Sequence, residues 1–313
     1  MTGVSPLRLS RLVALAAVFA VGTGLYGVYH YVSNYWDYRG FAPPHDASFV
    51  RVHGTAGRFY VRSAALGGRR QPVDFYLPPG YRTHPYRRYP VMYLLHGFPG
   101  RPGAFISTVR MGVVEDELVA LHRARPMILA MPFGSTGSFT DKEWADGVRR
   151  NDKWESFVSD DVVAAVDRRF RTIRTASARV LAGLSEGGYG AVNIGIHHPS
   201  EFGTIESWSG YMRADDLGSI FGHRRPLLHY NTPLDTVAAA APTLRRLHTS
   251  FWLYTGKDDT LRRQNVLFAN ELATLGIPHQ FYLVRGGHNW ALWRGNAARA
   301  YLAASRRIRL HAA

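Results

Sequence analysis

Hydrophobic residues fall into short apolar runs that alternate with longer stretches of helical periodicity. The apolar runs predict strands at residues 58–63, 73–77, 91–95, 127–131, 179–183, 204–207, 250–254 and 280–284. Several of these runs are apolar throughout, which is typical of strands covered on both faces. The stretches between them predict helices over residues 113–123, 154–170, 187–197, 261–275 and 290–311. This alternation indicates an α/β fold with a mostly parallel central sheet flanked by helices.

Two stretches depart from the alternation. Residues 40–47 read GFAPPHDA, and this Pro- and Gly-rich composition is typical of a linker. Residues 211–247 interrupt the order of strands and helices, so we expect an insertion, a cap or lid, between two core strands. The predicted organisation is therefore an N-terminal segment over residues 1–38, a linker over 39–57 and an α/β domain over 58–313.

The N-terminal segment is apolar enough to span a membrane. No formally charged residue occurs between Arg11 and Asp37, and residues 12–29 read LVALAAVFAVGTGLYGVY. Arg8 and Arg11 precede this stretch, which favours a cytoplasmic N-terminus. The far interface would be occupied by aromatic residues, namely Tyr26, Tyr29, Tyr31, Tyr35, Trp36 and Tyr38. Because no clear A-x-A cleavage site follows, we favour a single-pass signal anchor over a cleaved signal peptide. Either alternative predicts an extracellular or periplasmic domain, which would be secreted if the segment were cleaved.

Composition narrows the possible functions. The 313 residues include 38 Lys+Arg, 23 Asp+Glu and no cysteine, for a formal net charge of +15. Without cysteine there is no disulfide, no thiolate metal site and no Cys nucleophile. The arginines are scattered, and no basic helix or aromatic-interleaved stripe is present, so we expect no nucleic-acid partner. The excess charge instead favours proximity to an anionic envelope.

The sharpest chemical motif is G-L-S-E-G over residues 183–187. It follows the apolar run ARVLAG and precedes a helical stretch, which is the context of a nucleophile elbow. Glycines permit the sharp strand-to-helix turn that exposes the hydroxyl of Ser185. The sequence therefore predicts Ser185 as a nucleophile.

A serine nucleophile needs a base, and His288 is the histidine best placed for that role. It lies in VRGGHNW, a glycine turn between the last predicted strand and the last predicted helix. Loops at the carboxyl ends of parallel strands are where such sheets place their ligands. The base needs an acid in turn, and both Asp258 and Asp259 follow the strand at 250–254. The spacing does not choose between these two carboxylates.

The loop HGFPG at residues 96–100 follows another predicted strand and is suited to an oxyanion hole. Pro99 has no N–H, so we predict that the backbone amide of Phe98 is one donor and that of Glu186 the other. We expect His96 to structure this loop and not to act in catalysis.

The chain from Asp74 to Trp293 resembles the putative-esterase (esterase D-like) branch of the α/β-hydrolases. The matching motifs are DFYLPPGY at 74–81, YPVMYLLHG at 89–97, DKWESF at 152–157, the elbow at 183–187 and GGHNW at 286–290. This branch includes feruloyl and acyl esterases, S-formylglutathione hydrolases and antigen 85 mycolyltransferases. The resemblance implies an α/β-hydrolase fold. The family's G-x-x-D pattern, carried onto residues 256–259, favours Asp259 over Asp258 as the acid.

Three functions are compatible with these features. The first is an exported, membrane-anchored serine esterase that hydrolyses acyl esters through an acyl-enzyme. The second is a mycolyltransferase-like acyltransferase that passes the acyl group to a sugar hydroxyl, and the third is a non-catalytic envelope protein. The intact Ser, Asp and His favour an enzyme. Trp144 and Trp154 are candidates for lining the site, with core packing an equal alternative. We expect no cofactor and no catalytic metal, and an acyl ester of a small molecule, lipid or glycolipid as substrate.

Overall fold

A computed structural model describes residues 6–137 and 139–308, with the backbone alone for residues 6–13. The chain divides into two compact units, Met1–Pro43 and Pro44–Ala313. The first unit is built on helix α1 (Pro6–Tyr38). Its stretch Ala14–Tyr38 is long and apolar enough to cross a membrane, and none of its most apolar window is buried. Apolar side chains such as Leu15 and Phe19 are 67% and 74% exposed, which argues against a core helix. The cations predicted to precede the span, Arg8 and Arg11, lie outside the described side chains.

The second unit is organised around one eight-stranded sheet with the order β1-β2-β4-β3-β5-β6-β7-β8. Strands β3 to β8 pair in parallel, and β1 and β2 add an antiparallel edge. All eight predicted strands are confirmed, with bounds that move by a few residues. They are β1 (Thr55–Ser63), β2 (Arg69–Leu77), β3 (Val91–Leu95), β4 (Ile128–Pro132), β5 (Arg179–Leu184), β6 (Thr204–Trp208), β7 (Ser250–Gly256) and β8 (His279–Val284).

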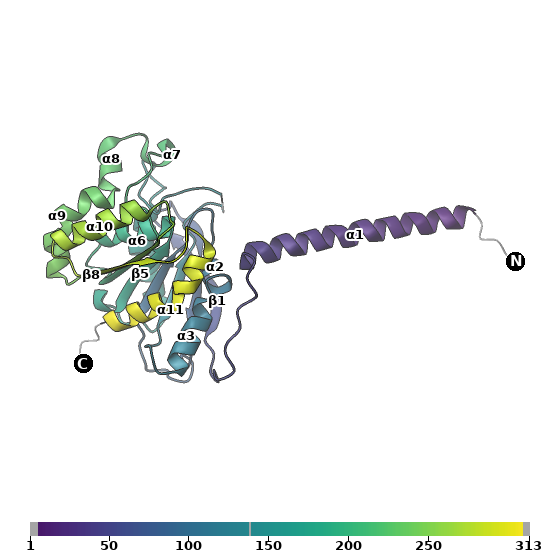
Figure 1. Cartoon of the computed structure of the whole chain (residues 1–313), viewed down its shortest axis with the longest axis horizontal. Coiled ribbons are helices and arrows are strands. Elements are labelled where there is room, and N and C mark those ends of the chain that lie inside the picture. The colour runs from purple at the N-terminus through teal and green to yellow at the C-terminus, as the bar shows by residue number, and fades with distance from the viewer. Residues whose placement is uncertain (1–5, 138, 309–313) are drawn as a thin grey trace. The chain divides into compact units, whose positions relative to one another are not determined.

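Helices cover both faces of the sheet, as its apolar strands require (Figure 1). Side chains alternate along β3, so that Val91 and Tyr93 join one buried cluster and Met92 and Leu94 join the other. The first cluster packs against α5 (Val163–Arg169), α6 (Glu186–His197), α9 (Pro233–Arg246) and α10 (Arg262–Thr274). The second packs against α2 (Ala104–Ser107), α3 (Met111–Ala120) and α11 (Trp290–Arg307). The predicted α/β-hydrolase class is therefore confirmed.

The predicted helix over 154–170 is not one regular α-helix. It consists of α4 (Trp154–Ser156), a π-helical stretch (Phe157–Val162) and α5. The wider π turn changes which side chains face the sheet, and periodicity alone does not reveal such a turn. The last helix ends at Arg307, before the predicted end at residue 311, and residues 309–311 lie outside the described residues.

Residues 211–247 separate into two parts. Helices α7 (Gly218–Phe221) and α8 (Arg225–Tyr230) form a small cluster with Ala145, apart from the main core. Helix α9 instead packs Val237, Ala241 and Leu244 into the sheet's main hydrophobic cluster. Only the part before α9 therefore extends beyond the helical layer that covers the sheet.

Candidate active site

Ser185 stands at a strained turn between β5 and α6. Its backbone has φ 54° and ψ −125°, a conformation that residues other than glycine rarely adopt. Two neighbouring glycines make the turn possible, because a Cβ on Gly183 would lie 2.1 Å from the carbonyl oxygen of Gly187. A Cβ on Gly187 would lie 1.9 Å from the carbonyl oxygen of Leu95. The strand, turn and helix thus hold the hydroxyl at the carboxyl end of the sheet.

The structure brings Ser185, His288 and Asp259 into one hydrogen-bonded chain. Ser185 Oγ lies 2.8 Å from His288 Nε2, and His288 Nδ1 lies 2.9 Å from Asp259 Oδ2. His288 occupies the loop after β8, and Asp259 the turn after β7. The side chain of His288 is 30% exposed whereas that of Asp259 is fully buried, so the serine end of the chain is accessible to water. This is the arrangement in which a histidine removes a hydroxyl proton while a carboxylate fixes its tautomer.

The carboxylate of Asp259 has a complete set of hydrogen-bond donors. Besides His288, it accepts from the hydroxyl of Ser209 and, at 2.8 Å, from the amide of Leu261. Burial alone would raise the pKa of the Asp259 carboxyl, but these hydrogen bonds outweigh burial and hold the pKa below its usual value. The neighbouring Asp258 is exposed. The structure thus places Asp259, and not Asp258, against the imidazole.

Ser209 is a residue that the sequence analysis missed. It is fully buried in the loop after β6, with a φ of 60°, and its Oγ also lies 2.8 Å from Thr255 Oγ1. No motif surrounds it in the sequence. Its contact with Asp259 depends on β6 and β7 being neighbours in the sheet, and a linear pattern does not give that pairing.

The loop predicted to form the oxyanion hole lies directly against the nucleophile. A Cβ on Gly97 would lie 2.9 Å from Ser185 Cβ and 3.1 Å from the carbonyl oxygen of Leu184. Phe98 follows this contact, and its residue is 42% exposed. On the other side, Glu186 is the first residue of α6, where backbone N–H groups have no acceptor within the helix. The positive end of the α6 dipole points to the same place, which suits a developing oxyanion.

His96 is buried and stabilises this loop through hydrogen bonds. Its Nε2 accepts from the amide of Gly134 at 3.1 Å, and its Nδ1 donates to the carbonyl of Gly97 at 2.9 Å. The indole of Trp144 donates to the His96 carbonyl at 3.0 Å. Burial lowers the pKa of His96 to about 4, so the ring is neutral at physiological pH. These contacts give His96 a structural position in the loop.

Two aromatic residues considered for the site belong to the core. Trp144 and Trp154 are 0% and 1% exposed, and the Trp154 indole donates to Asp152 Oδ1 at 2.6 Å. Neither ring is therefore available on a surface that a substrate could reach.

Buried carboxyl groups lie next to the turn that carries Ser185. Glu186 and Glu143 are 5% and 1% exposed, and the Tyr211 hydroxyl donates to Glu143 Oε2 at 2.8 Å. The ring of Tyr211 stacks on that of Tyr189 in α6, with 4.6 Å between their centroids. Burial, together with the nearby carboxylates including Asp141, raises the pKa values of both glutamates well above normal. The interior next to Ser185 is thus rich in carboxyl groups, but at 5% and 1% exposure neither glutamate lies on a surface that a substrate could reach.

Comparisons with known proteins agree with this architecture. A family model described as putative esterase matches residues 63–303. An endo-1,4-beta-xylanase/feruloyl esterase of Xylanibacter ruminicola is 31% identical over 139 residues, which cover 44% of this chain and 19% of that protein. An esterase of Mycobacterium tuberculosis is 27% identical over 258 residues, which cover 74% of this chain and 55% of that protein. The chain therefore spans only about a fifth to about a half of these relatives' lengths.

Solved structures share the fold over most of the chain. A ferulic acid esterase superposes with a TM-score of 0.72 at 24% identity, covering 82% of this chain and 99% of that one. An S-formylglutathione hydrolase from Agrobacterium tumefaciens superposes with a TM-score of 0.69 at 16% identity, covering 86% and 100%. At these identities the likeness shows a shared fold and does not by itself show a shared activity.

Proposed function

Because the chain belongs to the putative esterase family, we propose that it is a serine hydrolase that cleaves carboxylic esters through an acyl-enzyme. The observation that carries this proposal is the hydrogen-bonded chain from Ser185 Oγ through His288 to the buried carboxylate of Asp259. Each of the three residues stands at the end of a parallel strand, and the geometry matches the requirements of nucleophilic acyl transfer.

In the proposed mechanism, the Oγ of Ser185 attacks the ester carbonyl carbon as its proton moves to Nε2 of His288. The amides of Phe98 and Glu186 stabilise the negative oxygen of the tetrahedral intermediate. Collapse breaks the bond to the leaving alkoxide, which takes the proton from His288 and departs as the alcohol. Water then repeats the sequence: His288 removes its proton, the hydroxide attacks the acyl-serine, and the carboxylic acid leaves as Ser185 regains a proton. Asp259 stays ionised and stabilises the imidazolium.

Hydrolysis is favoured over transfer to a sugar because the imidazole that activates the acceptor is accessible to solvent, with its side chain 30% exposed. Water at the same face would intercept an acyl-enzyme before a weakly bound acceptor could. Two relatives carry the names feruloyl esterase and acetyl esterase, which supports small acyl esters as the first substrates to test.

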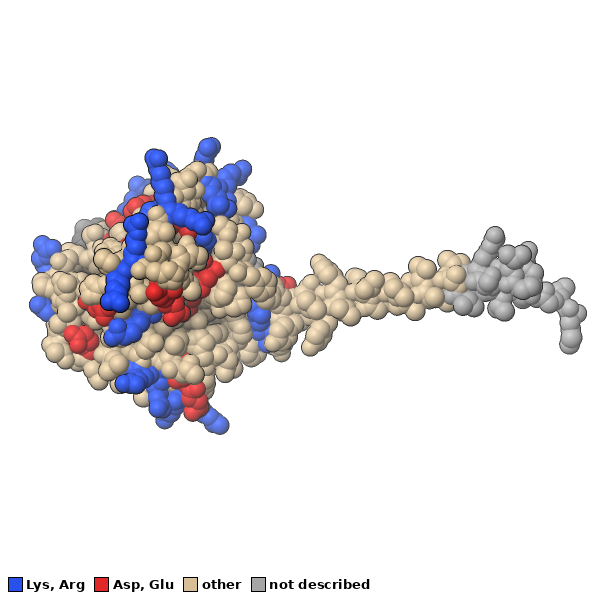
Figure 2. All heavy atoms as spheres, turned by 90° about the horizontal axis from the view of Figure 1, so that it is seen from above, with Lys and Arg blue, Asp and Glu red and all other residues tan. Residues whose placement is uncertain are grey.

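We also propose that α1 anchors the enzyme in the cell membrane with the α/β unit on the outside. The length and apolar composition of Ala14–Tyr38 support a span, although a signal sequence has the same properties. Figure 2 shows Lys and Arg side chains spread over the visible face of the α/β unit, with Asp and Glu side chains among them. A reporter fused after Tyr38 that works only outside the cytoplasm tests the orientation, and a cytoplasmic signal would contradict it.

The enzymatic proposal is tested with p-nitrophenyl esters of increasing chain length, with and without trehalose as acceptor. Ser185→Ala should lower kcat by about 10⁶-fold and abolish labelling by a fluorophosphonate. Ser177→Ala, which removes a hydroxyl near Thr175 Oγ1 outside the triad, should leave both unchanged. A wild-type protein that neither turns over these esters nor reacts with the fluorophosphonate would refute the esterase. If transfer of the acyl group to trehalose exceeded hydrolysis, the protein would be an acyltransferase and the esterase proposal would be wrong.

A further inference from the structure

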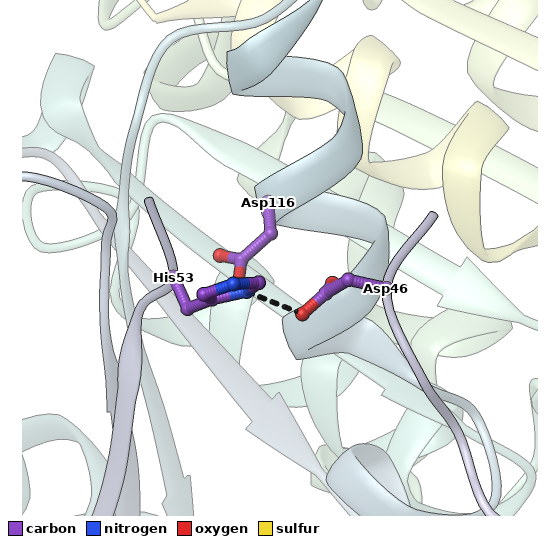
Figure 3. A group of neighbouring side chains, drawn as sticks. All are labelled: Asp46, His53 and Asp116. Carbon is purple, nitrogen blue, oxygen red and sulfur yellow. Dashed lines mark hydrogen bonds and ion pairs between the residues drawn. The ribbon is translucent and has the colours of Figure 1, made fainter. Parts of the chain in front are cut away.

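Asp46, His53 and Asp116 converge at the start of the α/β unit. Figure 3 shows the three side chains pointing toward one another, with Asp116 on α3 and the other two on the segment that precedes β1. One potential ligand atom from each residue lies within 4.8 Å of the other two. His53 Nδ1 is 2.7 Å from Asp46 Oδ2 and 3.8 Å from Asp116 Oδ2. One imidazole nitrogen thus faces two carboxylates.

This cluster is unusual in its balance of charge. In a chain with a formal charge of +15, both carboxylates have His53 as their only ion-pair partner among the described residues. Asp116 is only 1% exposed, so water screens its charge little. Two carboxylates thus share a single imidazole, and no Lys or Arg among the described residues pairs with either of them. The cluster therefore has more carboxylates than cationic partners, which favours binding of a cation.

One carboxylate oxygen also lacks a partner. Asp46 Oδ1 is buried and accepts no hydrogen bond within the described part of the chain. Asp116, in contrast, accepts from the Tyr76 hydroxyl at 2.7 Å and from the Gly54 amide. These donors fix the orientation of the Asp116 carboxylate, in the way that outer hydrogen bonds fix metal ligands. The arrangement provides one oriented carboxylate, one carboxylate with an unused oxygen, and one imidazole.

We propose that Asp46, His53 and Asp116 form a binding site for a divalent transition-metal ion of the Zn²⁺ type. Two carboxylate oxygens and one imidazole nitrogen form a common ligand set for Zn²⁺, with water completing the coordination. The nitrogen ligand disfavours Ca²⁺ and Mg²⁺, which take oxygen ligands. The ion replaces any proton on Nδ1 of His53. Tetrahedral coordination places ligand atoms about 3.3 Å apart, so binding would widen the 2.7 Å contact with Asp46 and shorten the 3.8 Å contact with Asp116.

The consequence is structural, because the site contains none of the three triad residues. Residues 44–54 form no helix or strand, and the Gly54 amide bonded to Asp116 is one of the contacts that hold them to α3. A shared ion would cross-link positions 46 and 53 to position 116 and so close a loop of more than sixty residues. Metal binding to the folded chain alone adds to its stability.

The test dialyses the full chain in detergent against buffers of defined free Zn²⁺ concentration, with bound metal measured by mass spectrometry and Tm by calorimetry. We expect Zn²⁺ to raise Tm by about 5 °C at a free concentration a hundred times its Kd. His53→Ala and Asp46→Asn should each lose one equivalent of bound Zn²⁺ and this rise in Tm. Both residues are partly exposed, so circular dichroism should show the variants folded.

The matched control is Asp216→Asn. Asp216 Oδ1 lies 3.0 Å from His223 Nδ1 in an exposed His–Asp pair that forms no such three-residue group. This variant should keep the full equivalent of Zn²⁺ and the full rise in Tm. The proposal is wrong if wild type gains no stability from Zn²⁺, or if His53→Ala and Asp46→Asn bind as much as wild type. Ca²⁺ binding that survives His53→Ala would likewise overturn it.

Discussion

The carboxylate of Asp259 meets the imidazole of His288 with 2.9 Å between Oδ2 and Nδ1, although the two residues are 29 positions apart. The contact exists because β7 and β8 are parallel neighbours, so the turns that follow them lie side by side. The adjacent Asp258 points into solvent. The turn after β7 therefore places Asp259 where it can orient the histidine and leaves Asp258 where it cannot.

The first prediction concerns this pair of aspartates. Asp259→Asn should lower kcat by about 10⁴-fold with little change in KM, because an amide in this place stabilises the wrong tautomer and no imidazolium. Asp258→Asn is the matched control and should retain activity within about twofold. The measurement is steady-state hydrolysis of p-nitrophenyl acetate. Loss of activity in Asp258→Asn with retention in Asp259→Asn would reverse the assignment.

A second prediction concerns Ser209, which supports the acid without reaching the ester. Ser209→Ala removes a donor to Asp259, leaving its carboxylate free to move and its pKa less depressed. We expect kcat to fall about tenfold at unchanged KM, while Tm falls by a few degrees. Ser209→Gly, which also removes the hydroxyl but suits a φ of 60°, should lower kcat to the same extent. A purely structural role would instead leave the kcat of the folded Ser209→Ala protein at the wild-type value.

The elements that carry the triad were predictable because each follows an apolar strand with a glycine turn. Ser185 and His288 have such turns in their own sequence, so local patterns suffice for them. The choice between Asp258 and Asp259 was not available from spacing, since both follow the same strand. It depends on the backbone path after Gly256, where a Cβ would lie 2.1 Å from the carbonyl oxygen of Gly286 in the histidine loop.

Contacts between distant loops account for what the sequence analysis missed. Glu143 and Tyr211 are 68 positions apart and meet only because the loops after β4 and β6 fold over the elbow. The apolar pattern at residues 157–162 also fits a continuous α-helix. The sequence therefore does not reveal the additional residue per turn of the π-helical stretch. Helix α9 lies within the expected insertion, and only its burial shows that it covers the sheet.

A third prediction uses the contact between Gly97 and the elbow. Gly97→Ala would place a Cβ 2.9 Å from Ser185 Cβ, so either the nucleophile or the loop carrying Phe98 must shift. Because displacement of one oxyanion donor typically costs two to three orders of magnitude, kcat should fall by about 100-fold. Gly295→Ala is the control: its Cβ has no atom within 4 Å, and in α11 it should raise the stability by about 0.5–1 kcal/mol. Equal activity of Gly97→Ala and wild type would show that the loop tolerates the methyl group and does not position the donor.

The last prediction concerns a buried ionic cluster outside the triad. Glu155 Oε1 lies 2.9 Å from His197 Nδ1 and 2.8 Å from His198 Nε2. Burial opposes charge on Glu155, but the hydrogen bonds from both histidines outweigh it and lower the Glu155 pKa. Burial likewise opposes charge on His198, and the bond to Glu155 outweighs it and raises the His198 pKa. The two shifts place the cluster's contribution to stability in a defined range of pH.

The depressed pKa of Glu155 gives stability that is present above its unfolded value of about 4.3 and lost as the pH falls. The raised pKa of His198 gives stability that is present below its unfolded value of about 6.5 and lost as the pH rises through the folded value. Glu155→Gln should therefore lower the free energy of unfolding most between about pH 5 and pH 6.5, by about 3 kcal/mol, and less at pH 9. Urea unfolding across this range measures the difference, and Asp216→Asn, at an exposed pair, should change it by less than about 0.5 kcal/mol at any pH. A deficit in Glu155→Gln that is constant from pH 5 to pH 9 would show that packing, and not ionisation, is what Glu155 contributes.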